Sequence, residues 1–257
     1  MSQEAAETPD AEQRAAKSKT KKPATVWTWL REIVIVIVIA LALSFLIKTF
    51  LFRPYFIPSP SMELTLQKDD RIFVNVLTPQ FFPLQRGDIV VFKDTQNWLP
   101  PTQTTPPNPF QQGLIFVGLM PDQSQQHLVK RIIGMPGDQV SCCDVQQRIT
   151  VNGTSLNEPY LYPGTDNTIG PNGTFNVTVP DGKLWVMGDN RNNSADSRAH
   201  QDSPGQGFVS VSDVEGVATV IAWPINRWTI LGNYPETFSE VPAPSDSASS
   251  PEPAPAG

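Results

Sequence analysis

Two serines each follow a proline in the segment "FIPSPSM", residues 56–62. A proline fixes its own φ and narrows the conformations of the residue before it, so Pro58 and Pro60 pre-set the backbone around Ser59 and Ser61. A serine hydroxyl held in this way is a candidate nucleophile, provided that a base removes its proton. The alternative interpretation of the same residues is a stiff, extended linker without chemistry.

Few residues of the chain could serve as that base. There are two histidines, and the segment "SADSRAH", which ends at His200, lacks the context of a nucleophile elbow. Lys130 lies in "HLVKRIIGMPGD", where strand alternation puts Leu128, Lys130 and Ile132 on one face and Arg131 on the other. This pattern predicts that Lys130 points into the domain while Arg131 reaches water.

Burial would prepare Lys130 for the role of a base. An exposed lysine has a pKa of about 10.4, and loss of hydration lowers it because the charged form is disfavoured. A base that works near neutral pH needs this pKa lowered by roughly 2–3 units. The alternative is a lysine at a strand edge whose ammonium group reaches water along its apolar stem.

A third segment, "MGDNRNNSADSR" at residues 187–198, has the Gly, Asn, Asp and Ser content of a surface turn. It follows the apolar segment "KLWVM", and a strand there would deliver the turn to a fixed place. In that place Ser194 could hydrogen-bond a neutral lysine and orient it. Asp196 and Arg198 could pair and hold the turn.

The surrounding residues, from about 55 to 234, read as short strands between turn signals, which indicates a mainly β fold. The expected strands are "RIFVNVL", "DIVVF", "LIFVGLM", "HLVKRIIG", "QRITVNG", "FNVTV", "KLWVMG" and "VEGVATVIAWPI". Residues 95–112 are rich in proline and predict a loop. No convincing amphipathic helix longer than two turns interrupts this pattern.

A long apolar segment precedes the serines. Its core, residues 33–47, gains flanking aromatic residues and reaches about 26 residues, where a membrane span needs roughly 20. Lipid forces backbone hydrogen bonds inside the segment, so we expect a helix. Five basic residues between Arg14 and Lys22 place the N-terminus in the cytoplasm. A cleavable signal peptide is the alternative, but its "ALA" site at residues 40–42 lies inside the apolar run.

These segments predict four parts: a disordered cytoplasmic tail (1–25), a transmembrane anchor (26–52), an extracytoplasmic β domain (53–235) and a disordered Pro/Ala/Ser-rich tail (236–257). The net charge is −6 without a basic cluster beyond the N-terminus, which argues against nucleic-acid binding. No metal-ligand spacing appears, so no metal is expected. Adjacent Cys142 and Cys143 leave a strained vicinal disulfide and two free thiols equally open.

Together the motifs resemble the bacterial type I signal peptidase family, the membrane-anchored Ser–Lys endopeptidases. The segments "IPSPSMELTL", "GDIVVF", "VKRIIGMPGD" and "GDNRNNSADSR" are similar to that family's serine box, next strand box, lysine box and last box, in the same order after an anchor. The resemblance covers roughly residues 30–232. It implies a mostly antiparallel β-sheet domain, an exposed apolar surface that rests on the membrane, and no cofactor.

The resemblance also implies a reaction, the removal of N-terminal signal peptides from secretory preproteins after an A-x-A-like site at the bacterial plasma membrane. Membrane lipid, the preproteins and the secretion translocon are the implied partners. The implied roles are a nucleophile (Ser61), a general base (Lys130), an oxyanion donor (Ser59), an orienting hydroxyl (Ser194), a stabilising ion pair (Asp196 and Arg198) and a shallow pocket for small side chains (Ile57, Met62, Leu128 and Val129).

Pro60 departs from the family pattern, which usually has glycine between the two serines. Proline leaves the N–H of Ser61 intact, but it would be incompatible with a positive φ at position 60. This departure motivates a second hypothesis, a catalytically inactive relative that binds preproteins without cutting them. A third hypothesis is a membrane-tethered structural module that reaches outward by its proline-rich tail.

Overall fold

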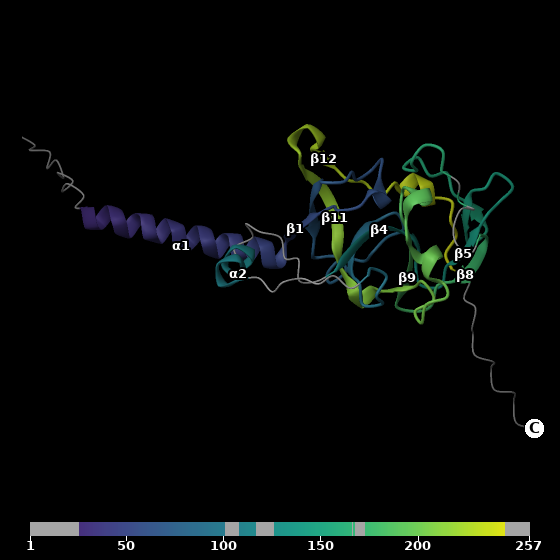
Figure 1. Ribbon diagram of the computed structural model, residues 1–257, viewed down its shortest axis with the longest axis horizontal. Coiled ribbons are helices and arrows are strands. Elements are labelled where there is room, and N and C mark those ends of the chain that lie inside the picture. Colours follow the sequence, from purple (N-terminus) through teal and green to yellow (C-terminus); the bar gives the residue numbers. More distant parts are fainter. Residues whose placement is uncertain (1–25, 101–107, 117–125, 166, 168–172, 245–257) are drawn as a thin grey trace, which may run out of the picture. The chain divides into compact units, whose positions relative to one another are not determined.

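The computed structural model describes residues 26–100, 108–116, 126–165, 167 and 173–244 (Figure 1). Its internal contacts divide the chain into two units, Met1–Ala40 and Leu41–Gly257. The tail predicted at residues 1–25 lies outside the described residues.

Helix α1, Val26–Phe50, covers most of the segment 26–52 that is predicted as a membrane anchor. Its segment Trp27–Leu46 has 20 residues, is long and apolar enough to cross a bilayer, and has no buried part. The β-branched residues in it would favour a strand in water, but a helix satisfies every backbone hydrogen bond within the segment. The helix ends at Phe50, and strand β1 begins at Phe52.

The domain that follows consists of two antiparallel sheets (Figure 1). The larger sheet has the order β1-β2-β11-β3-β4-β9-β10 with β12 paired to β11, and the smaller one has the order β7-β6-β5-β8. The predicted fold class, a mainly β protein with a mostly antiparallel sheet after one apolar N-terminal helix, is confirmed. The strands are β1 (Phe52–Phe56), β2 (Arg71–Asn75), β3 (Ile89–Lys93), β4 (His127–Gly134), β5 (Gln139–Cys142), β6 (Ile149–Val151), β7 (Thr154–Ser155), β8 (Phe175–Thr178), β9 (Lys183–Met187), β10 (Val209–Ser210), β11 (Val214–Trp223) and β12 (Thr229–Ile230).

Strand β4 occupies the whole of the predicted segment "HLVKRIIG" and pairs with β3 on one edge and β9 on the other. Its side chains reach three separate clusters of buried apolar residues. Leu128 and Ile132 belong to one cluster, Ile133 to a second, and Val129 packs against the third. Because apolar residues cover both faces of β4, a charged side chain on either face must find its partners inside the domain.

The strand predicted at "LIFVGLM" is wrong over residues 114–116, which form the end of helix α2, Pro109–Phe116. The loop predicted for residues 95–112 is wrong at its end for the same reason. Asn108 and Gln111 bond each other's backbone N–H groups in a capping box, and Pro109 takes the first helical position, where proline is favourable. Residues 117–120 of the predicted strand lie outside the described residues.

The disordered tail predicted from residue 236 is wrong for its first part. Residues 236–244 are described, beginning within the short helix η6, Pro235–Phe238. The side chains of Phe238 and Val241 are buried in the same cluster as Ile133. These two buried side chains thus fix a segment whose proline- and serine-rich composition suggests disorder. Residues 245–257 lie outside the described residues.

Candidate active site

The serine segment leaves β1 and tightens into a single 3₁₀ turn, η1, Pro60–Met62. Ser59 before it is extended, with φ −128° and ψ 156°, and Pro60 opens the turn. The fixed φ of proline suits the first position of a helical turn. Position 60 therefore does not require the positive φ that would exclude proline. The backbone N–H of Asn190 donates to the Ser61 carbonyl oxygen over 3.1 Å, which holds the turn from the opposite side.

Strand β4 brings Lys130 to this turn. The Lys130 Nζ lies 2.6 Å from the Ser61 Oγ and 3.1 Å from the Val129 carbonyl oxygen. Lys130 is 3% exposed and Ser61 8%, so their hydrogen bond is shielded from water. The prediction that Lys130 points into the domain is confirmed. Two residues 69 positions apart in the sequence thus form a hydroxyl–amine pair within hydrogen-bonding distance.

The surroundings of Lys130 make its amine easier to deprotonate. Burial lowers the pKa of Lys130 from 10.5 to about 8, against the opposing attraction of the Asp196 and Asp189 carboxylates. The nearby guanidinium of Arg198 adds to the lowering. An amine with this pKa is largely neutral in mildly alkaline solution, and only the neutral amine can accept a proton from a serine hydroxyl.

Ser59 adds a second hydroxyl to the pair. Its Oγ lies 3.3 Å from the Ser61 Oγ, and either oxygen can act as the donor. Because Ser59 is extended while Ser61 lies in the 3₁₀ turn, the two side chains meet although only one residue separates them. The site therefore holds an amine and two hydroxyls within a short distance of one another.

The loop after β9, residues 188–198, closes the site. Arg198 pairs with Asp196 through two hydrogen bonds of 2.9 Å, from Nε to Oδ1 and from Nη2 to Oδ2. Asp196 also accepts the N–H of Gly188 over 3.0 Å. Burial alone would raise the pKa of Asp196, but the Arg198 guanidinium and these hydrogen bonds hold it below its ordinary value. The predicted pairing of Asp196 with Arg198 is confirmed, and Asp196 stays ionised beside Lys130.

Ser194 lies in the same loop but does not make the contact expected of it. Its Oγ is buried and has no hydrogen-bond partner among the described residues. The hydrogen bonds of the Lys130 amine go instead to Ser61 and Val129. A side chain at position 188 would clash with both the Ser194 hydroxyl and the Ser61 carbonyl, so Gly188 is what lets the loop approach the serine turn.

The four residues expected to line a pocket do not all lie together. Ile57 and Met62 belong to one buried cluster, and Val129 packs against it. Leu128 belongs to a different cluster. Ile57 is 3% exposed and Met62 1%, so both lie beneath the surface instead of forming an open wall.

The prediction that Arg131 reaches water is wrong, because its side chain is fully buried. Its guanidinium forms a bidentate pair with Asp189, Nε to Oδ1 at 2.8 Å and Nη2 to Oδ2 at 2.7 Å, and lies 3.9 Å from the centre of the Tyr160 ring. Strand alternation indicates water on one side only when one face of the sheet is open, and β4 is covered on both. One feature of the sequence could have indicated a buried partner for Arg131. It is the carboxylate of Asp189, which directly follows Gly188 in the loop already assigned to the site.

Comparisons with known proteins identify the family of the chain. A family model described as "Signal peptidase, peptidase S26" matches residues 29–223. Signal peptidase I of Mycobacterium tuberculosis is 41% identical over 243 residues, which cover 86% of this chain and 82% of that relative. Signal peptidase I of Bacillus amyloliquefaciens is 34% identical over 225 residues, which cover 83% of this chain and 97% of that relative.

These matches define the class of protein first, a serine endopeptidase. The chain belongs to the signal peptidase family, peptidase S26. The reaction that this membership defines is the removal of signal peptides by a serine peptidase. A protein described as probable signal peptidase I of Mycobacterium leprae is similar to the same extent, at 40% identity over 256 residues, 87% of this chain and 85% of that relative.

Proposed function

We propose that Ser61 is the nucleophile and Lys130 the general base of this signal peptidase, and that the enzyme cuts secretory preproteins at the surface of the bacterial plasma membrane. The observation that carries the proposal is the 2.6 Å contact between the Ser61 Oγ and the buried amine of Lys130. A serine is a weak nucleophile until a neighbouring base accepts its proton. Lys130 is the basic side chain that the structure brings into hydrogen-bonding distance of this hydroxyl.

The chemistry proceeds in two halves. Neutral Lys130 accepts the Ser61 proton as the oxygen attacks the scissile carbonyl, and the ammonium then gives that proton to the leaving amine. The negative oxygen of the tetrahedral intermediate is met by the N–H of Ser61 and the hydroxyl of Ser59. Water, deprotonated by the same lysine, then hydrolyses the ester that links Ser61 to the acyl group.

The loop at 188–198 keeps the base in place. Asp196 and Arg198 act as positioning residues, because their pair fixes the loop and keeps a carboxylate near the amine. We assign Ser194 the role of orienting Lys130 during the reaction. Its buried hydroxyl, which has no partner among the residues described, supports this assignment, since such a group gains by finding a hydrogen-bond partner.

The apolar residues beside the serine turn set the choice of substrate. Ile57 and Met62 are buried in one apolar cluster with Val129 packed against it, and Leu128 belongs to a different cluster. We assign to these packed side chains the acceptance of small substrate residues and the rejection of large ones. This fits a preference for small residues at positions −1 and −3 of the substrate, the A-x-A pattern of signal-peptide cleavage sites.

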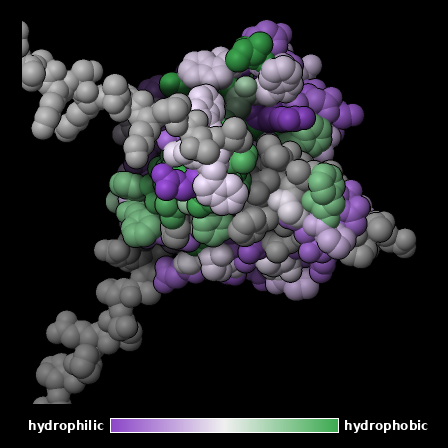
Figure 2. Space-filling view, turned by 90° about the vertical axis from the view of Figure 1, so that its left-hand side faces the viewer, coloured by the Kyte–Doolittle hydropathy of each residue, from purple (hydrophilic) through white to green (hydrophobic). Residues whose placement is uncertain are grey.

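Helix α1 anchors the enzyme in the plasma membrane with its N-terminus in the cytoplasm and the β domain outside, where the secretion translocon delivers preproteins. The basic residues before the helix support this orientation. Apolar side chains also lie on the surface of the protein (Figure 2). At the end of β11 and in the turn before β12, Trp223, Ile225 and Trp228 are exposed within six residues. Tryptophan favours the membrane–water interface, so we assign this turn to contact with lipid.

A cleavage assay with the full chain in detergent micelles tests the proposed function. The substrate is a preprotein with an A-x-A site, and mass spectrometry locates the cut. We expect cleavage directly after the −1 residue by the wild type, full activity in Ser239→Ala as a matched control, and no product with Ser61→Ala. Folded wild-type protein that leaves the preprotein intact would favour the inactive, preprotein-binding relative.

The lowered pKa of Lys130 predicts how cleavage depends on pH. Because its value is about 8, the neutral fraction grows about tenfold per pH unit below that point and levels off above it. We expect kcat/KM to follow the same curve. Initial rates at constant ionic strength between about pH 5.5 and 9.5 measure it. A plateau already reached near pH 7 would assign the base to a group other than this lysine.

A further inference from the structure

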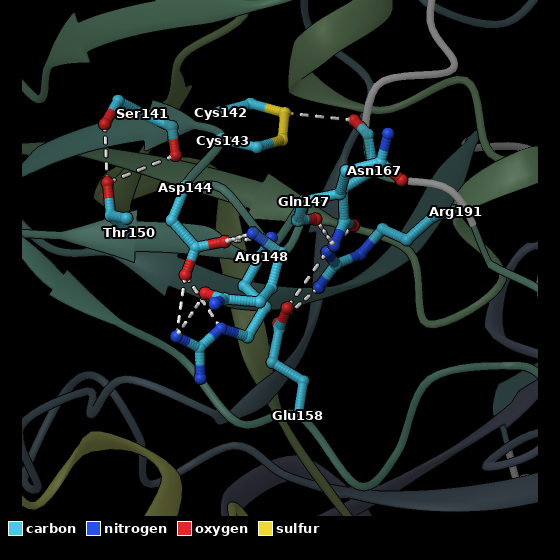
Figure 3. Close-up of a disulfide and its surroundings, with 11 residues drawn as sticks. Ser141, Cys142, Cys143, Asp144, Gln147, Arg148, Thr150, Glu158, Asn167 and Arg191 are labelled. Atoms are coloured by element: carbon cyan, nitrogen blue, oxygen red, sulfur yellow. Dashed lines mark hydrogen bonds and ion pairs between the residues drawn. A yellow bond between two sulfur atoms is a disulfide. The ribbon is translucent and has the colours of Figure 1, made fainter.

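Cys142 and Cys143 form a disulfide at the end of β5, outside the active site (Figure 3). Cys142 is buried in the apolar cluster that also contains Ile133, and Cys143 is half-buried at its edge. The two sulfurs therefore differ in their access to solvent. A small thiol reaches Cys143 more easily, which makes this sulfur the natural point of attack.

The disulfide touches a segment that is remote in sequence. The Cys142 Sγ lies 3.3 Å from the carbonyl oxygen of Asn167. A disulfide sulfur carries no hydrogen, so this is a contact of sulfur with oxygen in the oxidised protein. After reduction the Cys142 thiol can donate a hydrogen bond to this carbonyl, and the two sulfurs, no longer bonded, must move apart. A change in the oxidation state of the cysteines therefore acts directly on the contact between Cys142 and Asn167.

Asn167 in turn holds Arg191, at the start of the short helix η2, Arg191–Asn193 (Figure 3). Its Oδ1 accepts a hydrogen bond from the Arg191 Nη1 at 2.5 Å, and its Nδ2 donates to the Gln147 carbonyl at 3.1 Å. The same Nη1 also donates to the Glu158 Oε2 at 3.2 Å, and the Nη2 donates to the Glu158 Oε1, so the fully buried guanidinium divides its bonds between Asn167 and Glu158. A buried guanidinium that loses one acceptor cannot replace it with water, so a shift of Asn167 is transmitted to Arg191.

Arg191 is part of the loop that closes the active site. Its Nε donates to the Gly188 carbonyl at 2.9 Å, and its own carbonyl accepts from the Arg198 Nη2 at 2.8 Å. Gly188 lies against Ser61, and Arg198 holds Asp196. The contacts therefore run without interruption from the disulfide to both halves of the catalytic site.

We propose that the Cys142–Cys143 disulfide is a thiol-exchange site whose reduction displaces Asn167 and loosens the 188–198 loop through Arg191. In the exchange a thiolate attacks Cys143 Sγ, the S–S bond breaks, and Cys142 leaves as a thiolate that takes up a proton. A second thiol attacks the mixed disulfide and releases the second cysteine as a thiol. Two thiols are oxidised to one disulfide while the protein disulfide gains two electrons. For its effect on catalysis the inference rests on the proposed function.

The test uses the full chain in detergent micelles, before and after treatment with the dithiol dithiothreitol. Alkylation and mass measurement count the thiols, circular dichroism reports folding, and hydrogen–deuterium exchange reports the 188–198 loop. We expect two alkylated cysteines in a folded protein, faster amide exchange in the loop, and a kcat/KM lowered by about fivefold or more. Oxidised glutathione should restore the original values.

Two variants identify the route of the effect. Cys142→Ala/Cys143→Ala should not respond to dithiothreitol. Asn167→Ala should still be reduced, but its loop exchange and kcat/KM should no longer depend on the oxidation state. Resistance of the folded wild type to reduction, reduction without change in the loop, or unfolding on reduction would each overturn the proposal. Absence of cleavage by the oxidised wild type would contradict the proposed function alone, because loop exchange needs no substrate.

Discussion

Lys130→Met should lose peptide cleavage and gain stability at neutral pH. Methionine is unbranched and apolar, so it fills the space of the lysine stem without the amine. Without the base, Ser61 keeps its proton, and we expect kcat/KM to fall by about 10³-fold or more, the usual range for a general base. Cleavage of the A-x-A preprotein measures this part of the prediction.

The gain in stability follows from the cost of burying a charged amine. The pKa of Lys130 falls from 10.5 in an exposed chain to about 8 in the fold, a difference of roughly 3 kcal/mol. The variant also loses the hydrogen bond to Ser61, which offsets part of this amount. We therefore expect a net rise of about 1–2 kcal/mol in the free energy of unfolding at pH 7.

The dependence on pH gives this prediction its control. Because folding lowers the pKa of Lys130, the charged amine destabilises the folded state relative to the unfolded chain. This destabilisation is fully present below about pH 8. The penalty fades as the pH rises toward 10.5, because the lysine of the unfolded chain then also loses its proton. Urea unfolding should show the difference between the variant and the wild type shrinking over this range. The control variant Lys183→Met, at a part-exposed lysine, should change neither peptide cleavage nor the pH dependence of stability. A Lys130→Met variant that is less stable than the wild type at pH 7 would contradict the argument.

Sequence patterns predicted the elements that depend on local alternation. "HLVKRIIG" forms β4 over its full length because a run of apolar and β-branched residues ends at glycine. The pairing of Asp196 with Arg198 was also predictable, since two opposite charges two residues apart in a tight turn meet easily. Local patterns made Ser61 and Lys130 candidates, but the resemblance to a family was needed to pair them, because nothing local joins residues 69 positions apart.

The patterns failed where a tertiary contact decides the outcome. Arg131 is buried because a second cluster covers the face of β4 that alternation assigns to water. Phe238 and Val241 are ordered because the same cluster accepts them, although their neighbours have the composition of a disordered chain. The Ser194 hydroxyl has no hydrogen-bond partner within the part of the chain that the structure describes, a result that depends on side-chain directions which no spacing rule contains.

Asp189→Asn should destabilise the domain by about 3–5 kcal/mol, the usual cost of removing one member of a buried ion pair. Both side chains of the Arg131–Asp189 pair are fully buried, so the guanidinium left behind has neither a carboxylate nor water to balance its charge. Arg53→Ala, which breaks a pair with a half-exposed arginine, is the matched control and should cost less than about 1 kcal/mol. Urea unfolding of the three proteins side by side measures both values.

A second readout separates the loss of charge from a simple loss of packing. Asp189 is one of the two carboxylates that raise the pKa of Lys130, so its removal should lower that pKa further and move the rise of kcat/KM to lower pH. The double variant Arg131→Met/Asp189→Leu removes both charges and should recover part of the stability, because no unpaired ion remains. It should nevertheless keep the shifted pH profile, since the carboxylate is absent in both. A double variant no more stable than Asp189→Asn would mean that this pair acts by its shape, not by its charge.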